Sequence, residues 1–149
     1  MNKLVDMGLL VSSRTGNLQY YEINKKAPFY SEFRAIIQKT IGIEAIIKNK
    51  LKGLRGIAFA FIFGSYAKKE LRPESDIDMV IIGTISEDRL VKIFRDAEKE
   101  TGREINYHIY SLPEFKNRLK TNSFTKNIIE DCIIVAGDDG KFRTMLKEA

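Results

Sequence analysis

The sequence predicts an α+β fold in which a small β-sheet is flanked by helices and preceded by a β-hairpin and a long helix. A continuous apolar run of strand length, residues 57–63, and a second hydrophobic segment, residues 77–82, are each followed by a glycine. Such runs are typical of strands buried on both faces of a sheet. With 149 residues, 44% of them hydrophobic, the chain has the size and composition to build a single core.

The first part of the chain predicts a β-hairpin. Residues 3–7 form a short helical stretch, and residues 9–11 and 18–23 have the composition of strands. The segment between them, residues 13–17, is rich in turn-forming residues. We therefore expect the two strands to pair with each other.

Two helices are predicted around the first apolar runs. After Pro28, apolar side chains recur at helical spacing up to Gly53, so we expect one long helix with Ser31 as its N-cap. Residues 86–102 form the second helix, with the final glycine as its stop signal. Its buried side is expected to consist of Leu90, Ile93, Phe94 and Ala97.

The C-terminal part continues the alternation of strands and helices. Residues 104–110 alternate polar and apolar side chains, which predicts a half-exposed strand. Residues 111–114 have the form of a capping box with a proline in the first turn, so residues 112–119 are expected to be helical. We expect further helices at residues 123–131 and 141–149 and a short strand at residues 132–135.

Composition restricts the chemistry that the chain can perform. Cysteine and histidine occur once each, as Cys132 and His108, which excludes a disulfide framework and a Cys/His zinc site. Any metal must therefore be held mainly by oxygen, which favours carboxylates and a hard cation such as magnesium or manganese. No window approaches the about 20 apolar residues of a membrane span. The first ten residues also lack a signal-peptide cleavage pattern, so we expect a cytoplasmic protein without a membrane segment.

The net charge of +5 is distributed unevenly along the chain. Residues 1–56 carry a net charge of +6, and the remainder carries −1. A basic N-terminal part is typical of a polyanion-binding protein, but a solvated lysine-rich helix face produces the same pattern. Both interpretations remain open.

One constellation of residues points to nucleotide chemistry. Gly64 and Ser65 directly follow the first apolar run, and Asp76 and Asp78 lead into the second. Because side chains on a strand alternate, both carboxylates lie on one face, where their repulsion favours a bridging divalent cation. Gly64 permits a close backbone approach, and Ser65 is expected to start a short helical turn over residues 66–71 that offers N–H groups and a hydroxyl to a phosphate.

At these residues the sequence resembles the nucleotidyltransferase superfamily that includes DNA polymerase beta and kanamycin nucleotidyltransferase. The superfamily's signature is Gly-Ser, about a dozen variable residues, then Asp-x-Asp on the next strand. Each half alone is common, and the specificity comes from their spacing. The resemblance implies a small mixed β-sheet over residues 54–149, with Mg²⁺ or Mn²⁺ held by Asp76 and Asp78. It also implies that ATP or another nucleoside triphosphate is bound by Gly64, Ser65 and Ser75.

The resemblance is incomplete at two positions. Members of the superfamily have a third carboxylate on a later strand, and this chain has Asn106 there. An amide is no general base, so either Glu104, two residues earlier on the same face, substitutes for the third carboxylate as the catalytic base, or the domain binds nucleotide and transfers it poorly or not at all. His108 shares this face, where a structural histidine is the favoured interpretation over a catalytic base. The minimal members of the superfamily commonly have glycine in place of Lys69, a departure expected to affect loop conformation only.

The N-terminal residues also resemble part of a winged helix-turn-helix regulator. Residues 4–11, 14–17, 20–24 and 28–29 are similar to the end of a recognition helix, the wing hairpin and the linker. An ordinary hairpin packed on the long helix is the alternative interpretation. The expected division is therefore a partial winged-helix-like hairpin over residues 1–30, a connecting helix over 31–53 and the nucleotidyltransferase domain over 54–149.

Two functional hypotheses follow from the sequence. The first is a metal-dependent enzyme that transfers a nucleoside monophosphate from a nucleoside triphosphate to an unidentified acceptor hydroxyl. The alternative is a DNA-associated regulator or antitoxin-like partner whose nucleotidyltransferase domain is catalytically weakened. Only weak, non-specific DNA binding is expected, because barely one turn of a recognition helix is present. The isoleucine-rich long helix allows a homodimer or a complex with a partner protein.

Overall fold

The protein is described by a computed structural model that covers residues 2–40, 42–70 and 75–148. The chain divides into two compact units, Met1–Gln38 and Lys39–Ala149. The candidate site lies in the second unit, which contains the sheet. No helix within the described residues is long and apolar enough to cross a bilayer.

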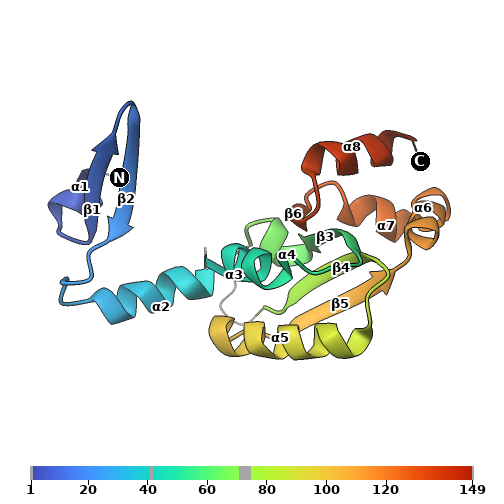
Figure 1. The fold of residues 1–149 in the computed structure, drawn as a ribbon, viewed down its shortest axis with the longest axis horizontal. Coiled ribbons are helices and arrows are strands. Elements are labelled where there is room, and N and C mark those ends of the chain that lie inside the picture. The colour runs from blue at the N-terminus through green and yellow to red at the C-terminus, as the bar shows by residue number, and fades with distance from the viewer. Residues whose placement is uncertain (1, 41, 71–74, 149) are drawn as a thin grey trace. The chain divides into compact units, whose positions relative to one another are not determined.

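The second unit is built on a four-stranded mixed sheet (Figure 1). Its strand order is β5-β4-β3-β6, with β3 at Ile57–Phe63, β4 at Ile77–Gly83, β5 at Ile105–Tyr110 and β6 at Ile133–Ala136. Strand β3 pairs antiparallel with β4 and β6, whereas β4 and β5 are parallel. The predicted mixed sheet is thereby confirmed.

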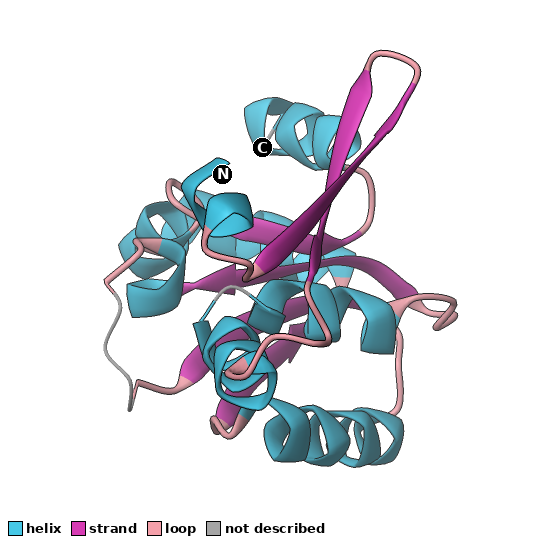
Figure 2. Ribbon diagram, turned by 90° about the vertical axis from the view of Figure 1, so that its left-hand side faces the viewer, coloured by secondary structure: helices cyan, strands magenta, loops and turns pink. Residues whose placement is uncertain are grey.

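Helices cover both faces of this sheet, as Figure 2 shows. On one face, Ile62, Met79 and Ile81 pack with residues of α3 (Gly42–Leu51) and α5 (Glu87–Thr101). The opposite face, with Phe61, Val80 and Ile82, packs against α6 (Leu112–Thr121), α7 (Ser123–Ile128) and α8 (Asp139–Glu148). Burial on two faces explains why β3, and β4 after Asp78, consist of consecutive apolar residues and do not alternate apolar with polar side chains.

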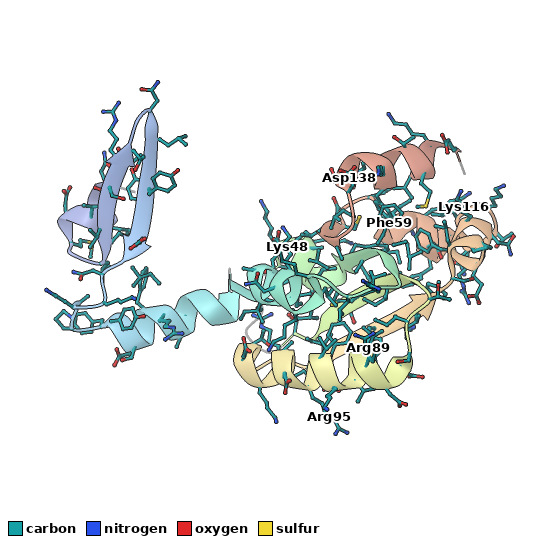
Figure 3. The ribbon with its side chains drawn as sticks, in the orientation of Figure 1. Lys48, Phe59, Arg89, Arg95, Lys116 and Asp138 are labelled. Carbon is teal, nitrogen blue, oxygen red and sulfur yellow. The ribbon has the colours of Figure 1, made fainter. Side chains whose placement is uncertain are left out.

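Helix α5 has the amphipathic pattern that the sequence predicts. Leu90, Phe94 and Ala97 are buried in the core, while Arg95 projects away from the sheet (Figure 3). The helix ends where Gly102 adopts φ 68° and donates its N–H to the Glu98 carbonyl. A left-handed C-terminal residue strongly favours glycine, so this stop signal was readable from the sequence.

Some helix and strand ends differ from the predictions by one to three residues. Helix α7 ends at Ile128, and β6 is displaced by one residue because its register pairs Ala136 with Ala60. Helix α8 begins at Asp139 rather than at residue 141. The reason is the Asp138 carboxylate, which accepts a hydrogen bond of 2.8 Å from the Lys141 N–H and so acts as the helix cap.

The predicted long helix is described in two parts, α2 (Tyr30–Thr40) and α3, and residue 41 lies outside the described residues. The prediction that Ser31 is its N-cap is wrong. The Phe33 N–H already bonds to the Phe29 carbonyl, so the helix begins at Tyr30 and Ser31 lies within its first turn. The Ser31 hydroxyl instead donates to the Glu32 carboxylate at 2.8 Å.

The first unit contains α1 (Asn2–Asp6) and an antiparallel hairpin of β1 (Leu10–Thr15) and β2 (Leu18–Ile23). The hairpin is confirmed, but its turn is shorter than predicted, because Ser13 to Thr15 continue the strand. Residues 2–36 include no buried side chain. The winged-helix resemblance and the boundaries at residues 30 and 53 remain predictions.

Candidate active site

Three polar positions meet where β3 ends and where β4 and β5 begin. In the antiparallel pair, Phe63 lies opposite Asp78, which places the following Gly64 beside this carboxylate. In the parallel pair, Asn106 lies opposite Asp78. Sheet register therefore brings together residues that are up to 42 positions apart in the sequence.

Gly64 makes a close approach to Asp78 that a side chain at position 64 would crowd. Its φ is 74°, and a Cβ atom there would lie 2.9 Å from Asp78 Oδ2. The turn that follows, α4 (Gly64–Ala67), begins at Gly64 and not at residue 66. Ser65 lies inside this turn instead of preceding it, and the end of the predicted turn, at residue 71, falls outside the described residues.

Lys69 occupies a left-handed conformation, with φ 59°. Its N–H bonds to the Tyr66 carbonyl at 3.0 Å, and the Glu70 N–H bonds to the Ser65 carbonyl at 3.0 Å. The position at which the superfamily commonly has glycine thus keeps a glycine-like backbone. The lysine holds this conformation against a steric cost of about 1–2 kcal/mol.

Asp78 lies in an environment that disfavours its ionised form. Burial raises the pKa of this carboxyl above its usual range, and the charge of Asp76 raises it further. A hydrogen bond from Asn106 and the nearby His108 lower the pKa. Asn106 also donates from Nδ2 to Asp76 Oδ2 at 3.2 Å, so a single amide contacts both carboxylates.

The donor set fits one cation held by oxygen. Among residues 2–40, 42–70 and 75–148, no group of three or more His, Cys, Asp or Glu side chains is arranged to hold a metal. Two carboxylates whose charges repel each other are nevertheless the usual protein contribution to a magnesium site completed by substrate phosphates. A divalent cation would compensate the charge that raises the pKa of Asp78.

Glu104 lies at the start of β5, and its backbone carbonyl accepts the Ile77 N–H at 2.8 Å. Its side chain is exposed, and no hydrogen bond joins it to Asp76 or Asp78 within the described part of the chain. Asn106, and not Glu104, is therefore the β5 residue that contacts the carboxylate pair.

A cleft of about 460 Å³ opens at Asp78, within the usual size range for small-molecule sites. It is lined by Phe63, Gly64, Lys68, Asp78, His108, Phe124, Asn127, Ile128 and Asp131. His108 is exposed, and its ring stacks on Tyr110 at 6.2 Å. His108 is therefore more exposed than the half-exposed strand predicted, and its structural role remains a prediction. A cavity of about 570 Å³ between α3 and β6 lacks the carboxylate pair.

Comparison with known proteins identifies the class of site to which this geometry belongs. Residues 45–138, more than half of the chain, match the family described as "Polymerase beta, Nucleotidyltransferase". The chain belongs to this nucleotidyltransferase family. A protein of Methanocaldococcus jannaschii named "Putative protein adenylyltransferase MJ0604" is 31% identical over 85 residues, which cover 57% of this chain and 82% of that protein.

Two solved structures share the fold of this nucleotidyltransferase. A toxin-antitoxin crystal structure with AMP-PNP has a TM-score of 0.51 at 14% identity, covering 70% of this chain and 82% of that chain. A mutant of the toxin-antitoxin MntA-HpeT has a TM-score of 0.50 at 12% identity, covering 70% and 81%. At these identities the likeness concerns the fold alone.

Arg103 hydrogen-bonds to the residue that precedes Asp76 in the candidate site, and it was not singled out from the sequence. Its side chain is 8% exposed, and Nη1 donates to the Ser75 carbonyl at 3.3 Å and to the Ser75 hydroxyl at 3.5 Å. Ser75, predicted to bind nucleotide, is thus tied to Arg103 immediately before Asp76, and it is not among the residues that line the cleft. Its predicted role remains untested.

The cleft residues that were not anticipated include Lys68, Phe124, Asn127 and Asp131. For Lys68 a signal existed, because a cation three residues after Ser65 is suitably placed for phosphate. The other three lie on or just after α7, about 50 residues beyond Asp78 in the sequence. Only the packing of α7 against the sheet brings them to the cleft.

Proposed function

We propose that this protein is an adenylyltransferase that uses a divalent cation to transfer AMP from ATP to an acceptor hydroxyl on a protein. The observation that carries the proposal is the paired carboxylates Asp76 and Asp78, one of them half-buried beside Gly64 in a nucleotide-sized cleft. The family supports nucleotidyl transfer. The name of the M. jannaschii relative supports adenylyl transfer and a protein acceptor.

Each residue of the proposed site has a role. Asp76 and Asp78 would hold Mg²⁺ or Mn²⁺, a cation that neutralises phosphate charge when bound. The missing side chain of Gly64 leaves space beside Asp78, Ser65 offers a hydroxyl, and Lys68 offers a positive charge to the phosphates. Phosphoryl transfer depends mainly on such positioning and charge compensation.

The transfer step is an in-line displacement. The acceptor oxygen forms a bond to the α-phosphorus, the bond from this phosphorus to the bridging oxygen breaks, and pyrophosphate leaves. The acceptor's proton passes to Glu104, whose exposed carboxylate lies on the same face of β5 as Asn106. His108 is a second candidate for this role, because its side chain lines the cleft.

A thermal-unfolding titration tests the metal site. Mg²⁺ or Mn²⁺ with AMP-PNP should raise the melting temperature of the full chain, because a ligand that binds only the native state stabilises it. The double variant Asp76→Asn, Asp78→Asn should lose this rise, whereas the control Asp96→Asn, on an exposed position of α5, should keep it. A rise of the same size in the double variant would place the metal elsewhere.

The melting temperature can also be measured without metal, as a function of pH. In EDTA, the single variant Asp78→Asn should melt at a higher temperature than the wild type near neutral pH, because it removes a charge that burial and Asp76 disfavour. A raised pKa means that this site destabilises the metal-free protein as the pH rises through that pKa. The difference between variant and wild type should therefore shrink as the pH falls below it.

The alternative hypothesis, a regulator or antitoxin-like partner with a weakened domain, is favoured by Asn106. This residue replaces the family's third acid and binds Asp76 instead of acting as a base. In that case the protein would bind ATP and the cation but transfer AMP slowly. The variant Asn106→Asp distinguishes the two hypotheses, since a rise in transfer rate would indicate that the natural protein is the attenuated form.

A further inference from the structure

The cleft at Asp78 has two chemically different walls. The wall formed by the sheet and α4 presents Gly64, Lys68, Asp78 and His108. The opposite wall, formed by α7 and the turn after it, presents Phe124, Asn127 and Asp131. One wall thus offers the charges that phosphates require, and the other offers an aromatic ring and an amide.

We propose that the α7 wall binds the nucleobase, with Phe124 stacked on the ring and Asn127 and Asp131 selecting a base that carries an exocyclic amino group. The proposal rests on the proposed function in one respect, namely that the triphosphate occupies the wall of Asp78 and Lys68. It goes further by assigning residues to base selection, which the motif around Asp76 does not address.

Phe124 is suited to stacking. Its side chain is 56% exposed, and an edge contact with Phe63, with ring centroids 6.1 Å apart at 85°, supports the ring. Phe63 is itself buried, at 8% exposure, so the aromatic platform is anchored in the core. An exposed ring with one anchored edge can offer its remaining surface to a base, and every base has a face that stacks.

Asn127 and Asp131 supply the polar part of the recognition. Asn127 follows Phe124 by three residues on a helix and so lies on the same side of α7, and both residues line the cleft. An asparagine amide pairs with adenine through one donor and one acceptor. The Asp131 carboxylate can only accept, so it favours a base edge with an amino group over one with a keto oxygen.

This chemistry predicts an order of nucleotide affinities. Adenine, cytosine and guanine each carry an exocyclic amino group, whereas uracil carries only keto oxygens beside its N–H donor. ATP and GTP should therefore bind most tightly, because they combine an amino group with the larger stacking surface of a purine. CTP should follow, and UTP should bind most weakly.

Calorimetric titration of the full chain with Mg²⁺ tests the α7 wall, using ATP, CTP, GTP, UTP and inorganic tripolyphosphate. Phe124→Ala should weaken binding of all four nucleotides by roughly 5- to 100-fold, and Phe124→Trp should restore it. Asp131→Asn should weaken ATP, CTP and GTP while leaving UTP unchanged or tighter, and Asn127→Ala should weaken ATP. Tripolyphosphate should bind every variant equally, because it lacks a base.

Two matched variants control for general effects. Asn117→Ala removes an exposed asparagine of α6 that does not line the cleft, and Phe29→Ala removes a phenylalanine of the first unit that is 65% exposed. Neither should change any affinity. If ATP binds but the Phe124 and Asn127 variants bind it as the wild type does, the α7 wall is refuted and the proposed function stands. If the wild type binds neither ATP nor tripolyphosphate, both proposals fail.

Discussion

Asn106 lies against the carboxylate pair at the position that, by the resemblance to the superfamily, corresponds to its third acid. Its amide donates to Asp76 at 3.2 Å and also hydrogen-bonds to Asp78. This arrangement ties the two carboxylates to β5 without adding a negative charge. In the proposed reaction, the proton of the acceptor hydroxyl therefore passes to a group other than Asn106. Glu104 is the carboxylate on the same strand face.

The role of Glu104 can be measured by substitution. Glu104→Gln should lower the rate of AMP transfer by roughly 100- to 10,000-fold, the usual contribution of a general base, with little change in the affinity for ATP. The control Glu87→Gln, at an exposed position at the start of α5, should leave the rate unchanged. A Glu104→Gln enzyme with the wild-type rate would exclude this carboxylate, and the same comparison would then pass to His108→Gln.

At the scale of single elements, α6 shows how a capping box at a helix N-terminus positions a core residue. The Ser111 hydroxyl accepts the Glu114 N–H at 3.3 Å, and the Glu114 carboxylate accepts the Ser111 N–H at 3.0 Å. Phe115 follows immediately and is fully buried against Phe61, with ring centroids 5.9 Å apart. The cap therefore fixes where α6 begins, immediately before Phe115 packs against the face of the sheet that contains Phe61.

Replacing the capping serine should reveal this contribution. Ser111→Ala should lower the free energy of unfolding by about 1 kcal/mol, measured by urea denaturation near neutral pH. Hydrogen bonds from Ser111 lower the pKa of Glu114, so the stabilisation is present above the ordinary glutamate pKa and is lost as the pH falls through the lowered value. Equal stability of the two proteins at neutral pH would contradict the capping assignment.

The elements that the sequence predicted well are those whose ends carry a local signal. Gly102 and the capping box of α6 are contained in a few adjacent residues, and the structure has both where they were expected. Ser31 and Ser65 are capable caps by residue type, but neither precedes its helix. Their helices start earlier because the Phe29 carbonyl and the end of β3 already supply the first turn.

At the scale of the whole molecule, the first unit determines what the basic N-terminal part can do. Residues 1–56 carry a net charge of +6, but α1, the helix that precedes the hairpin of β1 and β2, spans only five residues. Reading DNA sequence requires a braced helix in the major groove, whereas charge alone attracts phosphates without selectivity.

We therefore expect weak and sequence-independent DNA binding. Fluorescence anisotropy with duplexes of different sequence should give similar affinities for all of them, and the binding should disappear within about a few hundred millimolar salt through counterion release. Selection of one discrete sequence with nanomolar affinity at physiological salt would contradict this expectation and favour the regulator hypothesis.

The site was predictable from the sequence only in part. Gly64, Asp76 and Asp78 were identified because they flank two apolar strands at a spacing typical of the family, and sheet register then brings them together. Tertiary packing brings Phe124, Asn127 and Arg103 to the site. The spacing of neighbouring residues in the sequence does not indicate such packing. The site residues that strand pairing brings together could be predicted from the sequence. Those that helix packing brings to the site could not.

The most direct test of the central claim compares two positions of label on ATP. The full chain is incubated with Mg²⁺, a host-cell extract as the source of acceptor, and either α-labelled or γ-labelled ATP. The account predicts that label from the α position becomes covalently attached to a protein, that label from the γ position does not, and that the double variant Asp76→Asn, Asp78→Asn attaches neither. Transfer of the γ label, or an undiminished α signal in the double variant, would contradict adenylyl transfer at this site.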